Sequence, residues 1–248
     1  MLKVERQGTT ELIVIDRPEA SHALSAELVT GLVAAFDRAA SDPSVRVVVL
    51  GSTGDRVFLA GGDLRELRQL PMDAVGAERV LDLGRLARVI EDAPVPVIAA
   101  VSGVALGGGA ELLVACDLAV IDELASVRFV HKAMGLVPAW GGATRLSERV
   151  GSARAAELFL TARAVDAREA VAMGLAARVA ARTRATAEAL LLADELASSE
   201  RDVLVRLKRS LRASRDARRG AALAAEAEIF KEAWGSEAHR AAFAARSG

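Results

Sequence analysis

Aromatic residues and cysteine are scarce in this chain of 248 residues. Aromatic residues make up only 3% of it and tyrosine is absent, so the core has to be built from Val, Leu and Ile, with alanine-rich helices packed closely. The single cysteine, Cys116, excludes an internal disulfide and fits a reducing compartment. The formal net charge is -1, which gives no indication of a nucleic-acid partner or an anionic membrane surface.

Long apolar runs are also missing. The most apolar stretch, VPVIAAVSGVALGGGAELLVAC, is interrupted by Pro, Ser and glycines and does not have the length of a membrane span. The first residues, MLKVERQGTTELIVID, lack the charged-then-apolar pattern of a signal peptide. These absences predict a soluble, cytoplasmic protein.

Short runs rich in β-branched residues recur in the first half of the chain. They lack polar alternation, which predicts strands covered on both faces. Helical patterns lie between them, at 25–42, where Ser25 is the expected N-cap, and at 73–91. Strands that alternate with helices predict an α/β architecture. The expected strands are 11–16, 45–50, 96–101 and 117–122.

After about residue 141 the strand signals nearly vanish and alanine-rich helical patterns follow. In the last of them, Leu223, Ala227, Phe230 and Trp234 form an apolar stripe at helical spacing. We therefore expect an α/β core over 1–195 and a helical region over 196–248 that makes contacts between subunits. The expected helices are 153–161, 166–173, 185–198, 201–213 and 217–234.

Two glycine-rich turns from strand to helix carry the strongest functional signal. SGVALGGGAELLVACD places Gly108 at the start of a helix, and FLAGGDL places Gly61 and Gly62 before Asp63, a helix N-cap. The N–H groups of a first helical turn stabilise an oxygen that gains negative charge. Two such turns can form an oxyanion hole. A tight turn under a packed neighbour is the alternative for each.

Two ionisable residues stand out beside these turns. Glu111 lies three residues after Gly108, about one turn into the expected helix, and His131 follows a short strand pattern. Each also has a structural alternative: a carboxylate favoured by the helix dipole, or a histidine that only makes hydrogen bonds. His22 and His239 are weaker candidates. No group of His, Cys and carboxylates has metal-ligand spacing, so we expect no metal.

Four motifs occur in the order and spacing of the crotonase (enoyl-CoA hydratase/isomerase) superfamily, and the resemblance covers nearly the whole chain. It implies a ββα-superhelix fold in which the C-terminal helices build trimers or dimers of trimers. It also implies an acyl-CoA thioester as substrate, with coenzyme A as part of that substrate and no other cofactor. The motifs are RPEASHALS, FLAGGDL, SGVALGGGAELLVACD and GLVPAWGGATRL.

The resemblance also implies roles for particular residues. The amides of Gly62 and Gly108 would hold the thioester oxygen while an enolate forms. The coenzyme A arm would lie along two short segments: Ala23, Leu24, Ala60, Gly61, Asp63 and Leu64. Hydratases of the superfamily use two glutamates to position water and deliver a proton. Glu111 matches the first of these, but His131 falls on the second, which puts ordinary hydration in question.

A narrower resemblance involves the ethylmalonyl-CoA decarboxylase branch of the superfamily. VRFVHKAMGLVPAWGGATRL and the terminal WGSEAHRAAFAARSG are similar to it. The resemblance implies decarboxylation of a short malonyl-type thioester, ethylmalonyl-CoA or methylmalonyl-CoA, through the same enolate. His131 would hold the substrate carboxylate or protonate the enolate, and Trp140 would form an apolar wall that favours departure of CO₂.

One feature of this decarboxylase hypothesis needs an explanation. An ionised Glu111 would repel a substrate carboxylate, so either Glu111 is protonated and donates the proton, or the carboxylate faces away from it. Enoyl-CoA hydratase and enoyl-CoA isomerase are the alternatives, and isomerisation requires only one proton-shuttling base, which Glu111 can be. A protein that binds acyl-CoA without turnover is a third alternative.

Overall fold

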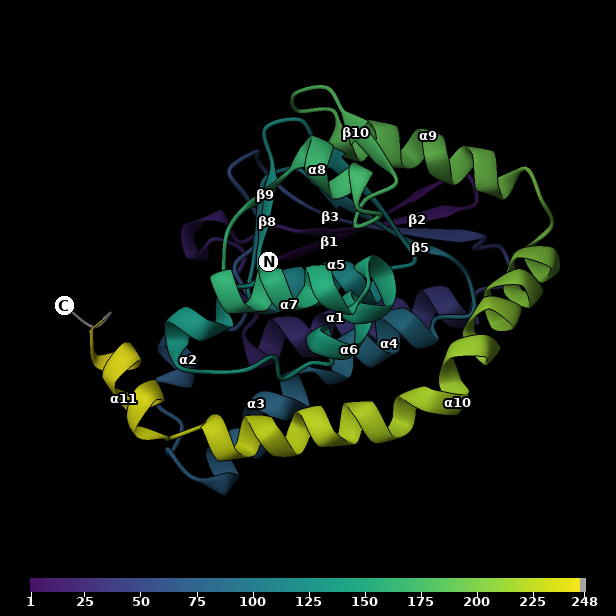
Figure 1. Cartoon of the computed structure of the whole chain (residues 1–248). Coiled ribbons are helices and arrows are strands. Elements are labelled where there is room, and N and C mark those ends of the chain that lie inside the picture. The colour runs from purple at the N-terminus through teal and green to yellow at the C-terminus, as the bar shows by residue number, and fades with distance from the viewer. Residues whose placement is uncertain (246–248) are drawn as a thin grey trace.

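A computed structural model describes residues 1–245, without the side chains of 214–218. Two sheets form its centre, one of six strands in the order β1-β2-β3-β5-β7-β10 and one of four in the order β4-β6-β8-β9 (Figure 1). Pairing is parallel except for β1 with β2 and β8 with β9. The strands are β1 (Leu2–Gln7), β2 (Thr10–Ile15), β3 (Val47–Ser52), β4 (Val57–Leu59), β5 (Val97–Val101), β6 (Val104–Leu106), β7 (Leu118–Asp122), β8 (Ser126–Arg128), β9 (Val165–Asp166) and β10 (Arg178–Ala180).

The larger sheet is covered on both faces, as its uninterrupted apolar runs predict. In β3, Val48 and Leu50 pack into the core shared with α1, α4 and α5, while Val47 and Val49 pack into a second core under α9. Figure 1 shows α9 on one side of this sheet and α1 and α4 on the other. The four expected strands are confirmed within one or two residues.

Helices make up most of the rest of the chain, and together with the two sheets they confirm the α/β class. Ser25 caps α1 as expected, because its hydroxyl accepts a hydrogen bond from Leu28 N–H at 3.2 Å. No helix within residues 1–245 is long and apolar enough to span a bilayer. The helices are α1 (Ala26–Ser41), α2 (Leu64–Leu67), α3 (Ala74–Leu83), α4 (Arg85–Asp92), α5 (Gly108–Ala115), α6 (Gly142–Val150), α7 (Ser152–Thr161), α8 (Ala167–Ala172), α9 (Ala185–Ala197), α10 (Arg201–Ala233) and α11 (Glu237–Ala244), with 3-10 turns η1 (Pro18–Ala20) and η2 (Val130–Met134).

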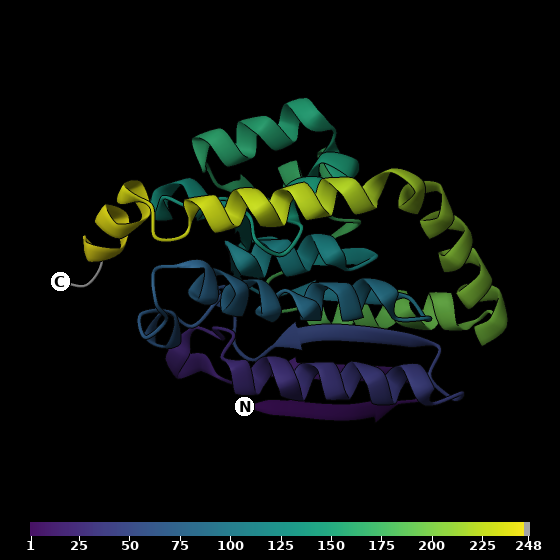
Figure 2. The same cartoon turned by 90° about the horizontal axis from the view of Figure 1, so that it is seen from below.

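Two expected helix boundaries are wrong. The segment 73–91 forms two helices that meet at Gly84, where a Cβ atom would lie 2.5 Å from the indole of Trp140. The two helices expected over 201–213 and 217–234 are a single helix, α10, of 33 residues. Helix α10 runs along the outside of the helical layer and packs against α3 and α6 (Figure 2). No proline separates the two expected segments, so the helix continues between them, although it changes direction along its length in Figure 2.

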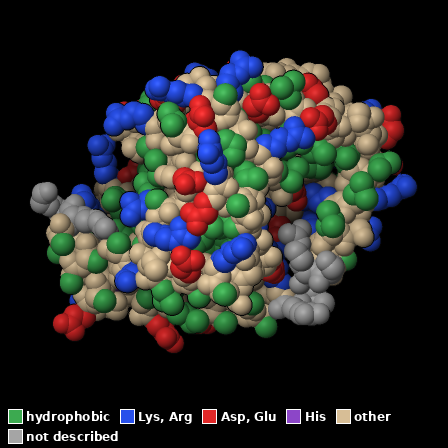
Figure 3. Space-filling view, turned by 45° about the horizontal axis from the view of Figure 1, so that its top comes forward, with side chains coloured by type: hydrophobic (Ala, Val, Ile, Leu, Met, Phe, Trp, Pro, Cys, Tyr) green, Lys and Arg blue, Asp and Glu red, His purple; other side chains and the backbone are tan. Residues whose placement is uncertain are grey.

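Acidic and basic side chains are interspersed over the face of the molecule that Figure 3 shows. One group of charges is instead buried, at the junction of α4, α6 and α10. Glu91 accepts hydrogen bonds from Arg145 at 2.8 Å and 3.2 Å and also pairs with Arg219. Arg219 pairs in addition with Glu148 at 2.8 Å. Burial opposes ionisation of Glu91, but the two guanidinium groups hold the pKa of that carboxyl below its ordinary value.

Glu91→Ala is therefore expected to destabilise the fold. The substitution leaves two buried guanidinium groups without their shared carboxylate, which costs about 3–5 kcal/mol of unfolding free energy at pH 7. Because the pKa of folded Glu91 lies below its ordinary 4.5, the stabilisation is present above that pH and is lost as the pH falls through the folded value. Urea denaturation of both proteins at pH 7 and in acid measures the difference.

Glu195→Ala is the matched control, because it breaks an exposed pair with Arg178. We expect little change in its denaturation midpoint. Equal effects of the two substitutions would contradict the role given to the buried cluster.

Candidate active site

The two glycine turns lie next to each other in the fold. Leu24 bonds to both neighbours of Gly62, with Leu24 N–H donating to Gly61 O at 2.7 Å and Asp63 N–H donating to Leu24 O at 3.0 Å. This pairing directs the N–H of Gly62 away from Leu24. A Cβ atom on Gly61, whose φ is +90°, would lie 3.0 Å from the backbone nitrogen of Gly108. Only glycine permits this approach and this backbone conformation.

The second turn ends at the N-terminus of α5. Gly108 is the first residue of α5, so its N–H has no acceptor within the helix. A Cβ on the next residue, Gly109, would lie 2.1 Å from Leu59 O. The run of glycines therefore reflects close backbone packing as well as an exposed amide. Both parts of the sequence interpretation, the tight turn and the free donor, apply to this segment.

A cavity of about 360 Å³ opens onto both turns. Its walls are almost entirely apolar, and Glu111 and His131 are the only ionisable residues that line it within the described part of the chain. The cavity is lined by Ala60, Gly61, Gly62, Leu64, Leu67, Val80, Leu106, Gly107, Gly108, Glu111, Val130, His131, Met134, Leu136, Val137, Ala139, Trp140, Phe230, Trp234 and Phe243. Two outward N–H groups and two proton-active side chains thus share one apolar cavity.

Glu111 is only 1% exposed, yet both of its carboxyl oxygens are hydrogen-bonded. Oε2 accepts from Trp140 N–H at 2.8 Å and Gly142 N–H at 2.9 Å. Oε1 lies 2.9 Å from His131 Nε2 and accepts a longer bond, at 3.4 Å, from Ala139 N–H. Main-chain N–H groups can only donate, so both carboxyl oxygens of Glu111 act as acceptors.

His131 lies in η2, directly after β8, with its ring beside Phe159 at a centroid distance of 5.8 Å. Its Nδ1 is buried and has no hydrogen-bond partner within residues 1–245. A proton on Nδ1 would be a buried donor without an acceptor, so the neutral ring favours the proton on Nε2, where it is donated to Glu111. The two side chains therefore lie side by side at one cavity, joined by the hydrogen bond from His131 Nε2–H to Glu111 Oε1.

Eight of the eleven residues expected in the site line the cavity: Ala60, Gly61, Gly62, Leu64, Gly108, Glu111, His131 and Trp140. The other three do not. Ala23 is buried and its carbonyl accepts from Arg17, and Leu24 is fully enclosed in the core. Asp63 caps α2 by accepting from Arg65 N–H at 2.8 Å and pairs with Arg17 at 2.7 Å. Although burial opposes it, these bonds hold the pKa of Asp63 below its ordinary value. The place of Ala23, Leu24 and Asp63 along a coenzyme A arm stays a prediction.

The sequence interpretation missed Glu226, a buried carboxylate on α10. It accepts hydrogen bonds from Ala143 N–H at 3.2 Å and from Thr144 N–H at 3.1 Å, at the N-terminus of α6. Burial, and then the nearby charge of Glu111, raise the pKa of Glu226 above its ordinary value. One signal was available: Glu226 falls between Leu223 and Phe230 on the apolar stripe of its helix.

The same stripe accounts for part of the cavity wall. Phe230 and Trp234 line the cavity, and Phe243 of α11 joins them. His239, the weaker histidine candidate, is fully buried between Trp234 and Phe243, at centroid distances of 4.7 Å and 5.2 Å. Within residues 1–245, no group of three or more His, Cys, Asp and Glu side chains is placed to hold a metal ion.

Known proteins share this architecture. The family model described as Enoyl-CoA hydratase/isomerase matches residues 5–245. The chain is 36% identical over 244 residues to a probable enoyl-CoA hydratase of Rhizobium meliloti (strain 1021), covering 98% of this chain and 93% of that protein. It is 30% identical over 243 residues to the short-chain-enoyl-CoA hydratase of Clostridium acetobutylicum, covering 98% of this chain and 92% of that protein.

Solved structures agree with these relatives. A crystal structure of an enoyl-CoA hydratase/isomerase from Mycobacterium paratuberculosis superposes with a TM-score of 0.90 at 28% identity, covering 98% of this chain and 97% of that one. The chain belongs to the enoyl-CoA hydratase/isomerase family, and its fold is the crotonase-like fold that the motifs imply. These relatives carry hydratase names, which favour the hydratase alternative over the decarboxylase hypothesis.

Glu111→Gln is expected to lower kcat by about 10²–10⁴-fold while acyl-CoA binding changes much less. The amide keeps the size of the side chain but removes the carboxylate and turns an NH₂ group toward N–H donors. Steady-state kinetics and calorimetric binding measure the two effects separately.

Glu226→Gln is the matched control, because it alters a carboxylate that bonds to the same end of α6 but does not line the cavity. A loss of kcat as large as that of Glu111→Gln would mean that Glu111 acts only by holding the turn. A substitution at Gly108 would not test the role of its N–H group cleanly, since any Cβ there would lie 2.1 Å from the ring of Trp140.

Proposed function

We propose that this protein is an enzyme that adds water to the double bond of an enoyl-CoA thioester. The observation that carries the proposal is the contact of 2.9 Å between Glu111 Oε1 and His131 Nε2 inside an apolar cavity. Glu111 can take a proton from water and return it to the substrate, and the imidazole N–H fixes the position of that carboxyl group.

The steps follow from these groups. The thioester oxygen accepts hydrogen bonds from the N–H groups of Gly62 and Gly108, which stabilise the enolate. Glu111 removes a proton from water as its oxygen bonds to the β-carbon of the substrate. The carboxylic acid formed on Glu111 then protonates the α-carbon of the enolate, which restores the carboxylate. His131 Nε2–H keeps its proton and holds Glu111 Oε1 in position. The net change is addition of one water, and no further cofactor takes part.

Decarboxylation of a malonyl-type thioester is the second candidate. One observation favours it: a histidine takes the place of a second carboxylate, so the lining of the cavity holds one acidic side chain and is otherwise apolar. His131 can then hold the substrate carboxylate, beside the apolar ring of Trp140. Against this stands the position of Glu111, because an ionised carboxylate so close to His131 would repel the substrate carboxylate. Isomerisation of an enoyl-CoA, with Glu111 alone as the base, is the third candidate.

Product analysis by mass spectrometry separates these reactions. The purified protein is offered crotonyl-CoA, methylmalonyl-CoA and ethylmalonyl-CoA. We expect water addition to crotonyl-CoA, and a loss of kcat in His131→Ala of about 10²-fold, because the hydrogen bond that positions the Glu111 carboxyl group is removed. Loss of CO₂ from the two malonyl thioesters, with crotonyl-CoA unchanged, would mean that the protein is a decarboxylase and not a hydratase. A shifted double bond with neither product would indicate isomerisation.

We also propose that the helical region 196–248 joins subunits into a trimer or a dimer of trimers; the last three residues of this region lie outside the described residues. Helix α10 supports the proposal, because three large apolar side chains face solvent at helical spacing. Val203, Leu207 and Leu211 are 46%, 57% and 68% exposed. Such a stripe on an isolated chain is typical of a contact surface.

The double substitution Leu207→Lys with Leu211→Lys is expected to reduce the oligomer to smaller species, because charges would be buried in the contact. Sedimentation velocity measures the mass. The control is Leu124→Lys, at a residue that is 67% exposed in the turn between β7 and β8, where we expect no change. Unchanged mass in the double variant would place the subunit contact elsewhere.

A cytoplasmic location remains a proposal. It is supported by the single cysteine, Cys116, which is buried and unpaired. Burial raises the pKa of its thiol to about 12, so Cys116 stays protonated and unreactive within the core.

A further inference from the structure

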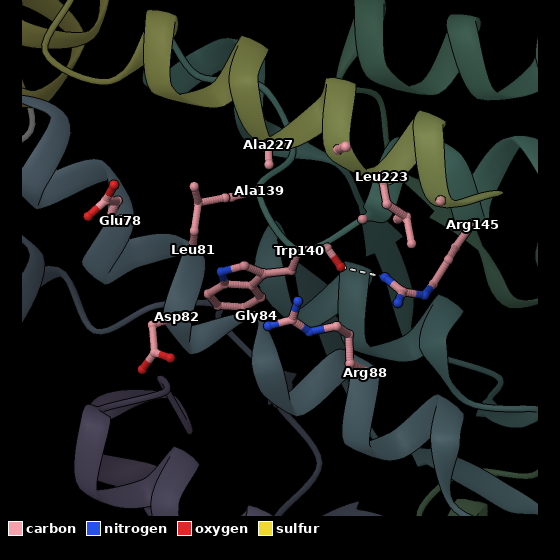
Figure 4. Close-up of a pocket in the computed structure, with 13 residues that line it drawn as sticks. Glu78, Leu81, Asp82, Gly84, Arg88, Ala139, Trp140, Arg145, Leu223 and Ala227 are labelled. Carbon is pink, nitrogen blue, oxygen red and sulfur yellow. Dashed lines mark hydrogen bonds between the residues drawn. The ribbon is translucent and has the colours of Figure 1, made fainter.

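Trp140 stands between two cavities. Its indole lines the cavity that holds Glu111 and His131, and it also lines a second cavity of about 530 Å³ between α3, α4 and α10. In Figure 4 the ring lies between the α3 segment that carries Leu81 and the α10 segment that carries Ala227. The indole is therefore a wall shared by both spaces.

The ring is held firmly in that position. Its Nε1–H donates to Val80 O at 2.9 Å, at the C-terminal end of α3. A Cβ atom on Gly84 would lie 2.5 Å from the ring, and one on Gly108 would lie 2.1 Å from it. Gly84 has an ordinary helical φ of -67°, so backbone conformation does not require glycine there. The lack of room for a Cβ atom does. Two glycines thus form the slot that the indole fills.

The ring also touches the reacting end of the proposed substrate site. Gly108, whose N–H is a proposed donor to the thioester oxygen, packs directly against it. Acyl carbons beyond the thioester therefore meet the indole close to the reaction centre. Behind the ring, the second cavity offers an apolar wall made by Leu81, Leu223 and Ala227, and charged residues such as Arg88 lie around it (Figure 4).

We propose that Trp140 determines acyl-chain length: its indole ends the acyl pocket and restricts the enzyme to short chains, and the cavity behind it is the space a longer chain would occupy without the ring. This inference rests on the proposed function insofar as it requires an acyl-CoA ligand. It does not depend on whether hydration or decarboxylation follows.

The test compares the binding of butyryl-CoA and decanoyl-CoA, two saturated thioesters that are not expected to react, by titration calorimetry. Wild type is expected to prefer butyryl-CoA. Trp140→Ala is expected to shift the ratio of dissociation constants toward decanoyl-CoA by about 10-fold or more. The main-chain N–H of residue 140 still donates to Glu111 in this variant, so the site keeps that contact. Trp140→Leu gives a smaller shift of the same sign, and replaces the alanine variant if that variant does not fold.

Trp234→Ala is the matched control. Trp234 lines the same first cavity and its Nε1–H also donates to a main-chain oxygen, that of Pro71 at 2.9 Å, but it does not line the second cavity. We expect no comparable gain for decanoyl-CoA. A gain in affinity for decanoyl-CoA in Trp234→Ala and none in Trp140→Ala would overturn the proposal, because the long acyl chain would then extend past Trp234 and not past Trp140.

A second variant tests the route itself. Ala227→Trp in the Trp140→Ala background refills the second cavity and is expected to abolish the gain for decanoyl-CoA. A gain that persists would overturn the assignment of that cavity. If wild type binds neither thioester, the acyl-CoA function fails and this inference fails with it. If wild type binds butyryl-CoA and Trp140→Ala leaves the ratio unchanged, only the inference fails.

Discussion

The carboxylate of Glu111 is the point on which the site depends. It lies one turn into α5 and accepts main-chain N–H bonds from Trp140 and Gly142, in the turn that leads into α6. One buried charge therefore fixes the distance between two segments that are far apart in sequence. The same bonds leave the other carboxyl oxygen for His131. A buried charge is tolerated only when it is bonded in this way.

Charge compensation extends outward from that point. Glu226 accepts the next N–H groups of α6, so two carboxylates serve one helix N-terminus. Arg145, one turn further, pairs with Glu91 and donates to the carbonyl of Trp140. Arg219 of α10 completes this cluster. The long C-terminal helix is therefore tied to the site through buried polar groups as well as apolar packing. Part of the cavity wall, including Phe230, comes from the same helix.

The site combines a family fold with a direct contact between a carboxyl group and a histidine. The sequence motifs predict that His131 stands where hydratases of the superfamily carry a second glutamate, and that correspondence stays a prediction. The sequence alone left open whether Glu111 was protonated. In the structure both of its carboxyl oxygens face N–H donors, and His131 Nε2 lies beside one of them. An ionised Glu111 in that place would repel a substrate carboxylate.

The sequence by itself determined the α/β class, the four long strands and the glycine turns, because hydrophobic period and glycine placement are local signals. It also identified Glu111 and His131 as candidates, through motif order. Tertiary structure decided the rest. The break at Gly84 depends on an indole from a distant segment, and the role of Glu226 depends on which helix end it meets. No local pattern encodes either, because each is a contact between residues that only folding brings together.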